Sequence, residues 1–209
     1  MKALLMSEKG DFAMIKNVIL DMGNVLLSYD PDVILNKVCE TEEEKQLIRT
    51  HLFESEIWLM GDRGEITNEQ RYDLAKEHLP KELHGKLKEC VTHWDICMHP
   101  IAGAKEFCHR CREKGYGIYV LSNACDHFYD YFPKHYDMNF FDGVMVSSDV
   151  HLIKPDTRIY ELLCETYDLN PEECVFIDDR LENVEAAKRV GMKGIVFEGD
   201  YKVVEKVIL

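Results

Sequence analysis

Residues 15–26 read IKNVILDMGNVL, and this stretch decides the fold class. It is an apolar, β-branched run that stops at Asp21 and is followed at once by a Met-Gly-Asn turn. A short apolar run bounded by turn residues is typical of a strand buried on both faces. Further runs of the same kind occupy residues 116–121, 143–146, 174–177 and 194–197.

Helical patterns separate several of these runs. Apolar residues recur at helical spacing over residues 155–167 and 181–190, and Gly191 then follows as a C-terminal cap. Strands that alternate with helices predict a parallel sheet with right-handed crossovers. We therefore expect an α/β fold with a Rossmann-like core, built from residues 14–29 and 99–209.

Residues 30–98 break this alternation, because they contain helical stretches and no convincing strand. The helical stretches cover residues 31–39, 42–51, 68–78 and 81–91. An insertion after the first strand lies over the carboxyl ends of the strands, where open α/β sheets bind ligands. We expect a small helical cap over residues 30–98 and a disordered N-terminal extension over residues 1–13.

Composition narrows the choice of partners. The chain has 209 residues, with 25 basic and 39 acidic side chains and a net charge of −14. Such a field repels polyanions, and no dense basic run offsets it, so we expect neither nucleic-acid nor anionic-membrane binding. No apolar run approaches the ~18 residues of a membrane span.

The eight cysteines indicate the cellular compartment. A disulfide framework suits short secreted chains, so we expect free thiols and a cytoplasmic protein. Cys108 and Cys111 form a Cys-x-x-Cys pair inside a helical pattern, with no second pair at zinc-finger spacing. We interpret both as small core-facing side chains. Monomer and homodimer are both compatible with the sequence.

Polar residues gather where the predicted strands end. The first strand delivers Asp21, the second Ser122 and Asn123, the third leads by a loop to Lys154, and the fourth delivers Asp178 and Asp179. Singly, each could be a helix cap or a turn residue. Together they supply a carboxylate nucleophile, carboxylates for a hard cation and a lysine for an anion. Phosphoryl transfer through an aspartyl-phosphate requires such a set.

In their order these residues resemble the haloacid dehalogenase (HAD) superfamily, from Ile15 onward. The resemblance rests on four motifs: Val18-Ile19-Leu20-Asp21-Met22-Gly23-Asn24-Val25, Val120-Leu121-Ser122-Asn123, Lys154-Pro155-Asp156 and Phe176-Ile177-Asp178-Asp179 through Asn183. It implies that Asp21 is the nucleophile and that Mg²⁺ is the cofactor. The implied metal ligands are Asp21, the Gly23 carbonyl and Asp179, with Asp178 as a further or water-mediated ligand and Asn183 in support. Ser122, the Asn123 amide and Lys154 would hold the phosphoryl oxygens.

One position departs from most phosphatases of the family. They place an aspartate two residues after the nucleophile as general acid and base, and here Gly23 occupies that position. The sequence is closest to a branch with an Asp-x-Gly-Asn-Val first motif, similar to α-D-glucose-1-phosphatase. The resemblance implies a Mg²⁺-dependent phosphatase acting on a small phosphorylated metabolite, with a sugar phosphate as one candidate. The alternatives are a weakly catalytic protein that binds a phosphorylated ligand and a 2-haloacid dehalogenase.

Substrate choice is expected to lie in the cap. Arg63 is a candidate contact to phosphate or sugar, on a turn that Gly61 and Gly64 would form. An equally good interpretation pairs Arg63 with Asp62 or Glu65 and makes Trp58 a core anchor. Either way, we expect the general acid that Gly23 cannot provide to come from the cap, or the substrate to carry a good leaving group.

Overall fold

The computed structural model describes residue 12 and residues 14–209, so the predicted N-terminal extension lies outside the described residues except for Phe12. A five-stranded parallel sheet runs through the described chain in the order β3-β2-β1-β4-β5. Its strands are β1 (Asn17–Leu20), β2 (Gly117–Ser122), β3 (Gly143–Val146), β4 (Cys174–Asp178) and β5 (Lys193–Val196). Each lies within two residues of a predicted run, which confirms the Rossmann-like α/β prediction.

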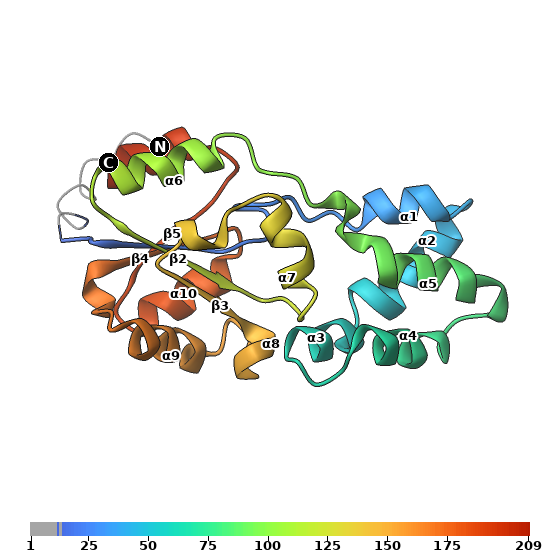
Figure 1. The fold of residues 1–209 in the computed structure, drawn as a ribbon. Helices are drawn as coiled ribbons and strands as arrows, with labels where there is room; N and C mark the ends of the chain where they lie inside the picture. The colour runs from blue at the N-terminus through green and yellow to red at the C-terminus, as the bar shows by residue number, and fades with distance from the viewer. Residues whose placement is uncertain (1–11, 13) are drawn as a thin grey trace.

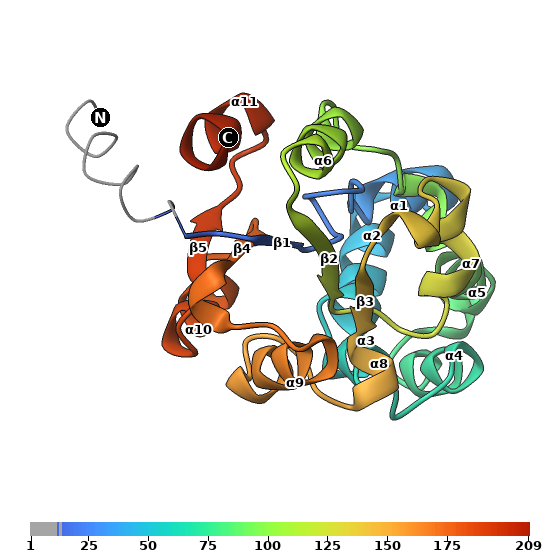
Figure 2. The same cartoon turned by 60° about the vertical axis from the view of Figure 1, so that its left-hand side comes forward.

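Helices cover both faces of the sheet (Figures 1 and 2). One face carries α6 (Ala104–Glu113) and α11 (Tyr201–Ile208), and the other carries α9 (Thr157–Tyr167) and α10 (Leu181–Arg189). Short helices α7 (Phe128–Tyr131) and α8 (Ser147–Val150) follow β2 and β3. Single 3-10 turns lie at Phe132–Lys134, Met138–Phe140 and Pro171–Glu173.

The alternation of side chains along β1 divides the core into two layers. Val18 and Leu20 belong to the cluster that includes Phe107 of α6, whereas Ile19 belongs to the cluster that includes Leu163 of α9. All of these side chains are fully buried. A strand that is apolar on both faces is what a doubly covered parallel sheet requires, so the run before Asp21 places this residue at a fixed edge.

The segment between β1 and β2 is helical, as predicted. It contains α1 (Asp32–Val38), α2 (Glu42–Ile48), a π-helical turn (Arg49–Phe53), α3 (Glu56–Asp62), α4 (Asn68–Lys76), a 3-10 turn (Lys81–Leu83), α5 (His84–His93) and a second 3-10 turn (Trp94–Cys97). These helices lie together beyond the end of the sheet to which β1 points (Figure 1). The boundaries of the cap at residues 30 and 98 stay a prediction.

Helix α3 differs from the prediction of a turn around Gly61 and Gly64. The helix continues through Gly61 to Asp62, and the chain turns only at Arg63 and Gly64. Packing, and not a turn, requires glycine at this position, because a Cβ on Gly61 would lie 1.7 Å from Nη2 of the buried Arg71. Gly61 therefore makes room for a guanidinium group inside the cap.

The positions of the cysteines agree with the prediction of core-facing thiols. All eight cysteines are buried and free, and Cys108 and Cys111 face the core from α6. This confirms their interpretation as core-facing side chains. Within residues 14–209, no helix has the length and apolar character needed to cross a membrane.

Candidate active site

Lys154 lies at the centre of a buried ionic network at the carboxyl ends of the strands. Its Nζ is 2.7 Å from Asp21 Oδ1 and 2.8 Å from Asp178 Oδ2, and it donates to the Leu121 carbonyl at 2.9 Å. Lys154 is only 3% exposed and Asp178 is fully buried. Because an ammonium group has three protons to donate, these three contacts satisfy it completely and fix its position.

Burial and charge act in opposite directions in this network. Burial raises the pKa of Asp21 to about 7, although Lys154 opposes this rise. Burial alone would lower the pKa of Lys154, but Asp21 and Asp178 outweigh it and raise the pKa overall. One lysine thus serves two buried carboxyl groups, and an additional cation beside them would favour the ionised form of Asp21.

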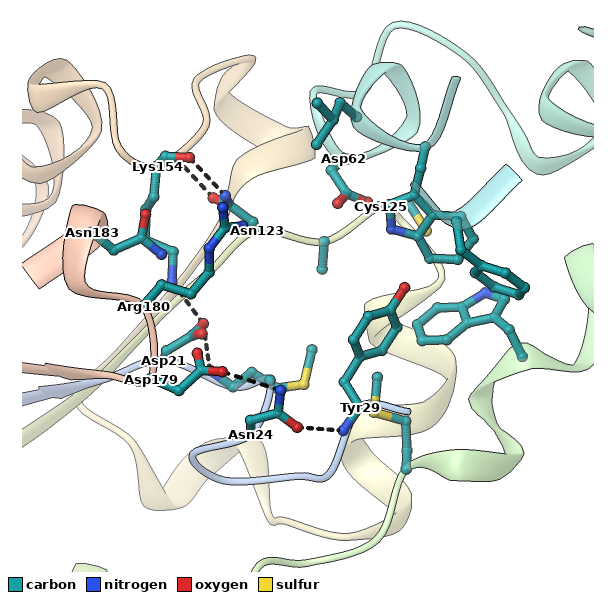
Figure 3. Close-up of a pocket in the computed structure, with 18 of the residues that line it drawn as sticks. Asp21, Asn24, Tyr29, Asp62, Asn123, Cys125, Lys154, Asp179, Arg180 and Asn183 are labelled. Carbon is teal, nitrogen blue, oxygen red and sulfur yellow. Dashed lines mark hydrogen bonds and ion pairs between the residues drawn. The ribbon is translucent and has the colours of Figure 1, made fainter. Parts of the chain in front are cut away.

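Asp179 adds a third carboxylate to the same place. Single oxygens of Asp21, Asp178 and Asp179 all lie within 4.8 Å of one another. Asn24 Nδ2 donates to Asp179 Oδ2 at 3.1 Å (Figure 3), and burial raises the pKa of Asp179. Asn183 Nδ2 donates to both oxygens of Asp178, at 3.1 and 3.0 Å. Clustered carboxylates that hydrogen bonds orient are the ligands that a hard divalent cation prefers.

The residues that end β2 lie beside the lysine. Asn123 donates to the Lys154 carbonyl and accepts from the Lys154 amide, both at 2.9 Å, so its side chain holds the lysine backbone in place (Figure 3). The Ser122 hydroxyl is buried and has no hydrogen-bond partner among the described residues. The structure therefore places Asp21, Gly23, Asn123, Lys154, Asp178, Asp179 and Asn183 at one network or its cavity, whereas Ser122 ends β2 directly before Asn123 and does not line the cavity.

A cavity of about 230 Å³ opens onto this network. Its core end is formed by Asp21, Gly23, Asn24, Asn123, Lys154, Asp179, Arg180 and Asn183 (Figure 3). Its remaining wall is formed mainly by apolar and aromatic residues: Met22, Tyr29, Phe53, Trp58, Leu59, Trp94, Met98, Ala124, Cys125 and Tyr131, with Asp62. Both the sheet and the cap segment thus contribute to one cavity.

Asp62 is a buried carboxyl group on the cap side of this cavity. Its Oδ1 is 3.5 Å from Nη2 of Arg71, which also donates to the Trp58 carbonyl and stacks 4.2 Å above the Trp58 ring. Burial raises the pKa of Asp62 to about 7, although Arg71 opposes this rise. The Ser147 hydroxyl donates to the Asp62 carbonyl at 2.5 Å, which ties α3 to the segment between β3 and Lys154.

Arg63 lies outside the cavity wall. Its guanidinium contacts Glu56 at 2.5 Å and Glu65 at 2.7 Å, and it is not among the residues that line the cavity. The structure therefore has the pairing with Glu65 that the sequence left open, in place of a substrate contact. Trp58 is buried and lines the cavity, so it is both a core residue and part of the site.

Two residues near the carboxylates received no role from the sequence. Asn24 adopts a positive φ of 54°, and in this turn its side chain bridges Asp179 and the Tyr29 amide (Figure 3). Arg180 lines the cavity while pairing with Glu182, and its amide donates to Asp178. An Asn in a tight turn directly after a catalytic strand was the available signal for the first. For Arg180, which directly precedes α10, the sequence offers no comparable signal.

An acidic site at the carboxyl ends of a parallel sheet, facing a helical insertion, defines a class of α/β hydrolytic enzymes. The chain belongs to the haloacid dehalogenase-like hydrolase family, whose pattern matches residues 15–191. It is 29% identical to the sesquiterpene phosphatase astK of Aspergillus oryzae, over 86% of this chain and 88% of that protein. It is 25% identical to the drimenol cyclase drtB of Aspergillus calidoustus, over 88% of this chain but only 34% of that protein.

A solved structure supports the fold. The HAD family enzyme bt-2542 of Bacteroides thetaiotaomicron, in complex with magnesium and inorganic phosphate, superposes with a TM-score of 0.73. The two chains are 23% identical, and the match covers 91% of this chain and 98% of that one. At this identity, the similarity confirms the architecture.

Proposed function

We propose that this protein is a Mg²⁺-dependent phosphatase that hydrolyses a small phosphorylated metabolite through an aspartyl-phosphate on Asp21. The observation that carries the proposal is the network in which Lys154 contacts both Asp21 and Asp178, with Asp179 beside them. Relatives that act as phosphatases and the magnesium and phosphate bound to bt-2542 support it. The cytoplasmic location and the choice between monomer and homodimer remain predictions from the sequence.

The geometry of Asp21 suits a nucleophile. Lys154 and the Met22 amide both contact Oδ1, at 2.7 Å each, and no described residue donates to Oδ2. These contacts fix the carboxylate and leave Oδ2 to attack phosphorus in line. The attack forms a bond between Asp21 Oδ2 and phosphorus while the bond from phosphorus to the ester oxygen breaks, and the departing oxygen takes a proton from water to become the alcohol. Water then attacks phosphorus, which frees phosphate and restores the carboxylate.

The other residues stabilise charge. Asp21, Asp179 and the Gly23 carbonyl would hold Mg²⁺, with Asp178 supporting. The bound ion would supply positive charge for the phosphoryl oxygens and favour ionised Asp21. Lys154 neutralises further charge, and the unpartnered Ser122 hydroxyl at the end of β2 would be a further donor to the phosphoryl oxygens. Three mutually close carboxylates make metal-free dehalogenase chemistry a poorer explanation of this site.

The test is phosphate release from p-nitrophenyl phosphate and a panel of metabolite phosphates, with Mg²⁺ and with a chelator. Release that needs both Mg²⁺ and Asp21 supports the proposal. If the folded protein binds Mg²⁺ but releases phosphate from none of these esters, the ligand-binding alternative would be favoured. Halide release from 2-haloacids in the presence of chelator would favour the dehalogenase.

A further inference from the structure

The cavity has a second region of distinct chemistry, formed by the rings of Tyr29, Trp58, Trp94 and Tyr131, which we call the aromatic wall. Trp94 is its centre, because its ring centroid lies 5.9 Å from that of Tyr29 and 5.3 Å from those of Trp58 and Tyr131. Trp58, Trp94 and Tyr131 are all buried. Mutual packing of this kind holds the rings in place before a ligand arrives, so the wall is a preformed surface.

Each ring of the aromatic wall carries a single polar atom, and the rest of its surface is carbon. Trp94 Nε1 and the Tyr131 hydroxyl are buried and have no hydrogen-bond partner in the described part of the chain. Among the described residues between 30 and 98, Asp62 is the one charged side chain that lines the cavity, and Arg71 accompanies it at 3.5 Å. The wall therefore presents mainly ring carbon to the cavity, and two of its four polar atoms are buried.

Resting on the phosphatase function proposed above, we infer that the substrate is the phosphomonoester of a small apolar alcohol, whose hydrocarbon part packs on the aromatic wall. Hydrocarbon gains free energy when it leaves water for such a surface. Sugar hydroxyls lose their water contacts there and find few replacements, which carries a penalty for each unpaired group. This substrate class differs from the sugar phosphate that the first motif suggested.

The dimensions of the cavity restrict the size of the apolar group. Its volume of about 230 Å³ must also hold the phosphoryl group, and sites for drug-sized ligands start at about 300 Å³. Leu59 lines the cavity and is 39% exposed, so part of the residue contacts solvent. A single ring or a short branched chain fits a volume of this size.

A matched pair of substrates tests the inference. Cyclohexylmethyl phosphate and glucose 6-phosphate are both esters of a primary alcohol on a saturated six-membered ring, and they differ mainly in the ring oxygen and hydroxyls. We expect kcat/KM with Mg²⁺ to favour cyclohexylmethyl phosphate by about tenfold or more. Equal values, or a preference for glucose 6-phosphate, would overturn the apolar substrate class.

Two leucines of the cap provide matched variants. Leu59 in α3 lines the cavity, whereas Leu74 in α4 is equally exposed, at 40%, and does not line it. Leu59→Asn should reduce the preference for the cyclohexyl ester by about threefold or more. Leu74→Asn should leave both kcat/KM values unchanged. An unchanged preference in Leu59→Asn, or the same change in both variants, would contradict an apolar contact between this cavity and the substrate.

p-Nitrophenyl phosphate separates this inference from the proposal on which it rests. Asp21-dependent release from this ester together with a preference for glucose 6-phosphate would overturn the apolar substrate class and keep the phosphatase. No Asp21-dependent release from any of the three esters would overturn both.

Discussion

The cavity has a core end, at Asp21 and Lys154, and a cap end, at Trp58, Asp62 and Trp94, and different interactions hold the two ends together. At the core end, the charged groups have defined partners. The single ammonium group of Lys154 contacts Asp21, Asp178 and the Leu121 carbonyl at the same time. At the cap end, aromatic rings pack on one another and leave Trp94 Nε1 unpartnered among the described residues. In the proposed function, the first arrangement positions charge for a reaction and the second, an apolar surface, selects what is attached to phosphate.

The largest effect is expected from Asp21→Asn, which removes the nucleophile at the core end. Phosphate release from p-nitrophenyl phosphate with Mg²⁺ should fall by about a thousandfold or more, because the covalent step is lost. Asp156→Asn is the matched control. It neutralises a carboxylate that lies two residues from Lys154 and does not line the cavity. Asp156 is the N-cap of α9, and asparagine is an equally good N-cap residue, so the helix should be retained. A similar loss in both variants would count against Asp21 as nucleophile.

The next effect concerns stability at the cap end. Gly61→Ala should lower the free energy of unfolding by about 3 kcal/mol, because the new Cβ would lie 1.7 Å from Arg71 Nη2 and displace the buried guanidinium. Gly85→Ala in α5 meets nothing within 4 Å and should instead stabilise by about 0.5–1 kcal/mol. Urea unfolding measures both. Equal effects of the two substitutions would mean that the space at Gly61 is not needed for Arg71.

Asp62 predicts a pH effect at the cap end. Its folded pKa of about 7 lies above the ordinary 3.8, so between these values the folded state binds more protons and stability falls as pH rises. Between pH 5 and pH 7 this group should remove about 2 kcal/mol from the free energy of unfolding.

The measurement is the difference between wild type and Asp62→Asn in urea unfolding at the two pH values. Contributions of Asp21 and Asp179 cancel in this difference, since both proteins contain them. The variant should be the less pH-dependent of the two by about 2 kcal/mol. Identical pH dependence would show that Asp62 titrates normally.

A smaller effect is expected from restoring an acid at the core end. A Cβ at Gly23 has only the Tyr29 Cβ nearby, at 3.9 Å, and Gly23 is not among the glycines with positive φ, so Asp fits there. Gly23→Asp should raise kcat/KM for alkyl phosphates by about tenfold, below the roughly 10²- to 10⁴-fold of a well-positioned acid. p-Nitrophenyl phosphate should gain less, because its leaving group needs little protonation.

Gly23→Asn controls for the added bulk, since it has the shape of Asp and no acidic proton. Equal rate changes in the two variants would assign the effect to shape. No gain in Gly23→Asp for any alkyl ester would mean that proton transfer to the leaving group does not limit the reaction.

The core end was largely predictable from the sequence. Asp21, Asn123 and Asp179 directly follow strands, and the carboxyl ends of parallel strands meet at one edge, so the pattern that placed β1 also placed Asp21. The positive φ of Asn24 and the clamp of Asn123 on the Lys154 backbone depend on local geometry. No periodicity encodes them.

The cap end was predicted only as helical. The pairing of Asp62 with Arg71 depends on how α3 and α4 pack. In the sequence Gly61 resembles a turn residue, but in the structure it leaves space for the Arg71 guanidinium. Helix α11 was not predicted either, although Asp200 caps it by accepting from the Lys202 amide. Arg63 shows why a charged residue of the cap cannot be assigned to substrate from the sequence alone. Its partners Glu56 and Glu65 lie nearby in the sequence and compete with any substrate for the guanidinium group.

The proposal that Asp21 becomes phosphorylated is tested by locating the covalent intermediate. The protein would be mixed with p-nitrophenyl phosphate and Mg²⁺, quenched in acid within one turnover, digested and examined by mass spectrometry. We predict one phosphoryl group on Asp21 that is absent with chelator and absent in Asp21→Asn. Turnover with a phosphoryl group on Asp178 or Asp179, or with none on the protein at any time before product appears, would contradict the account.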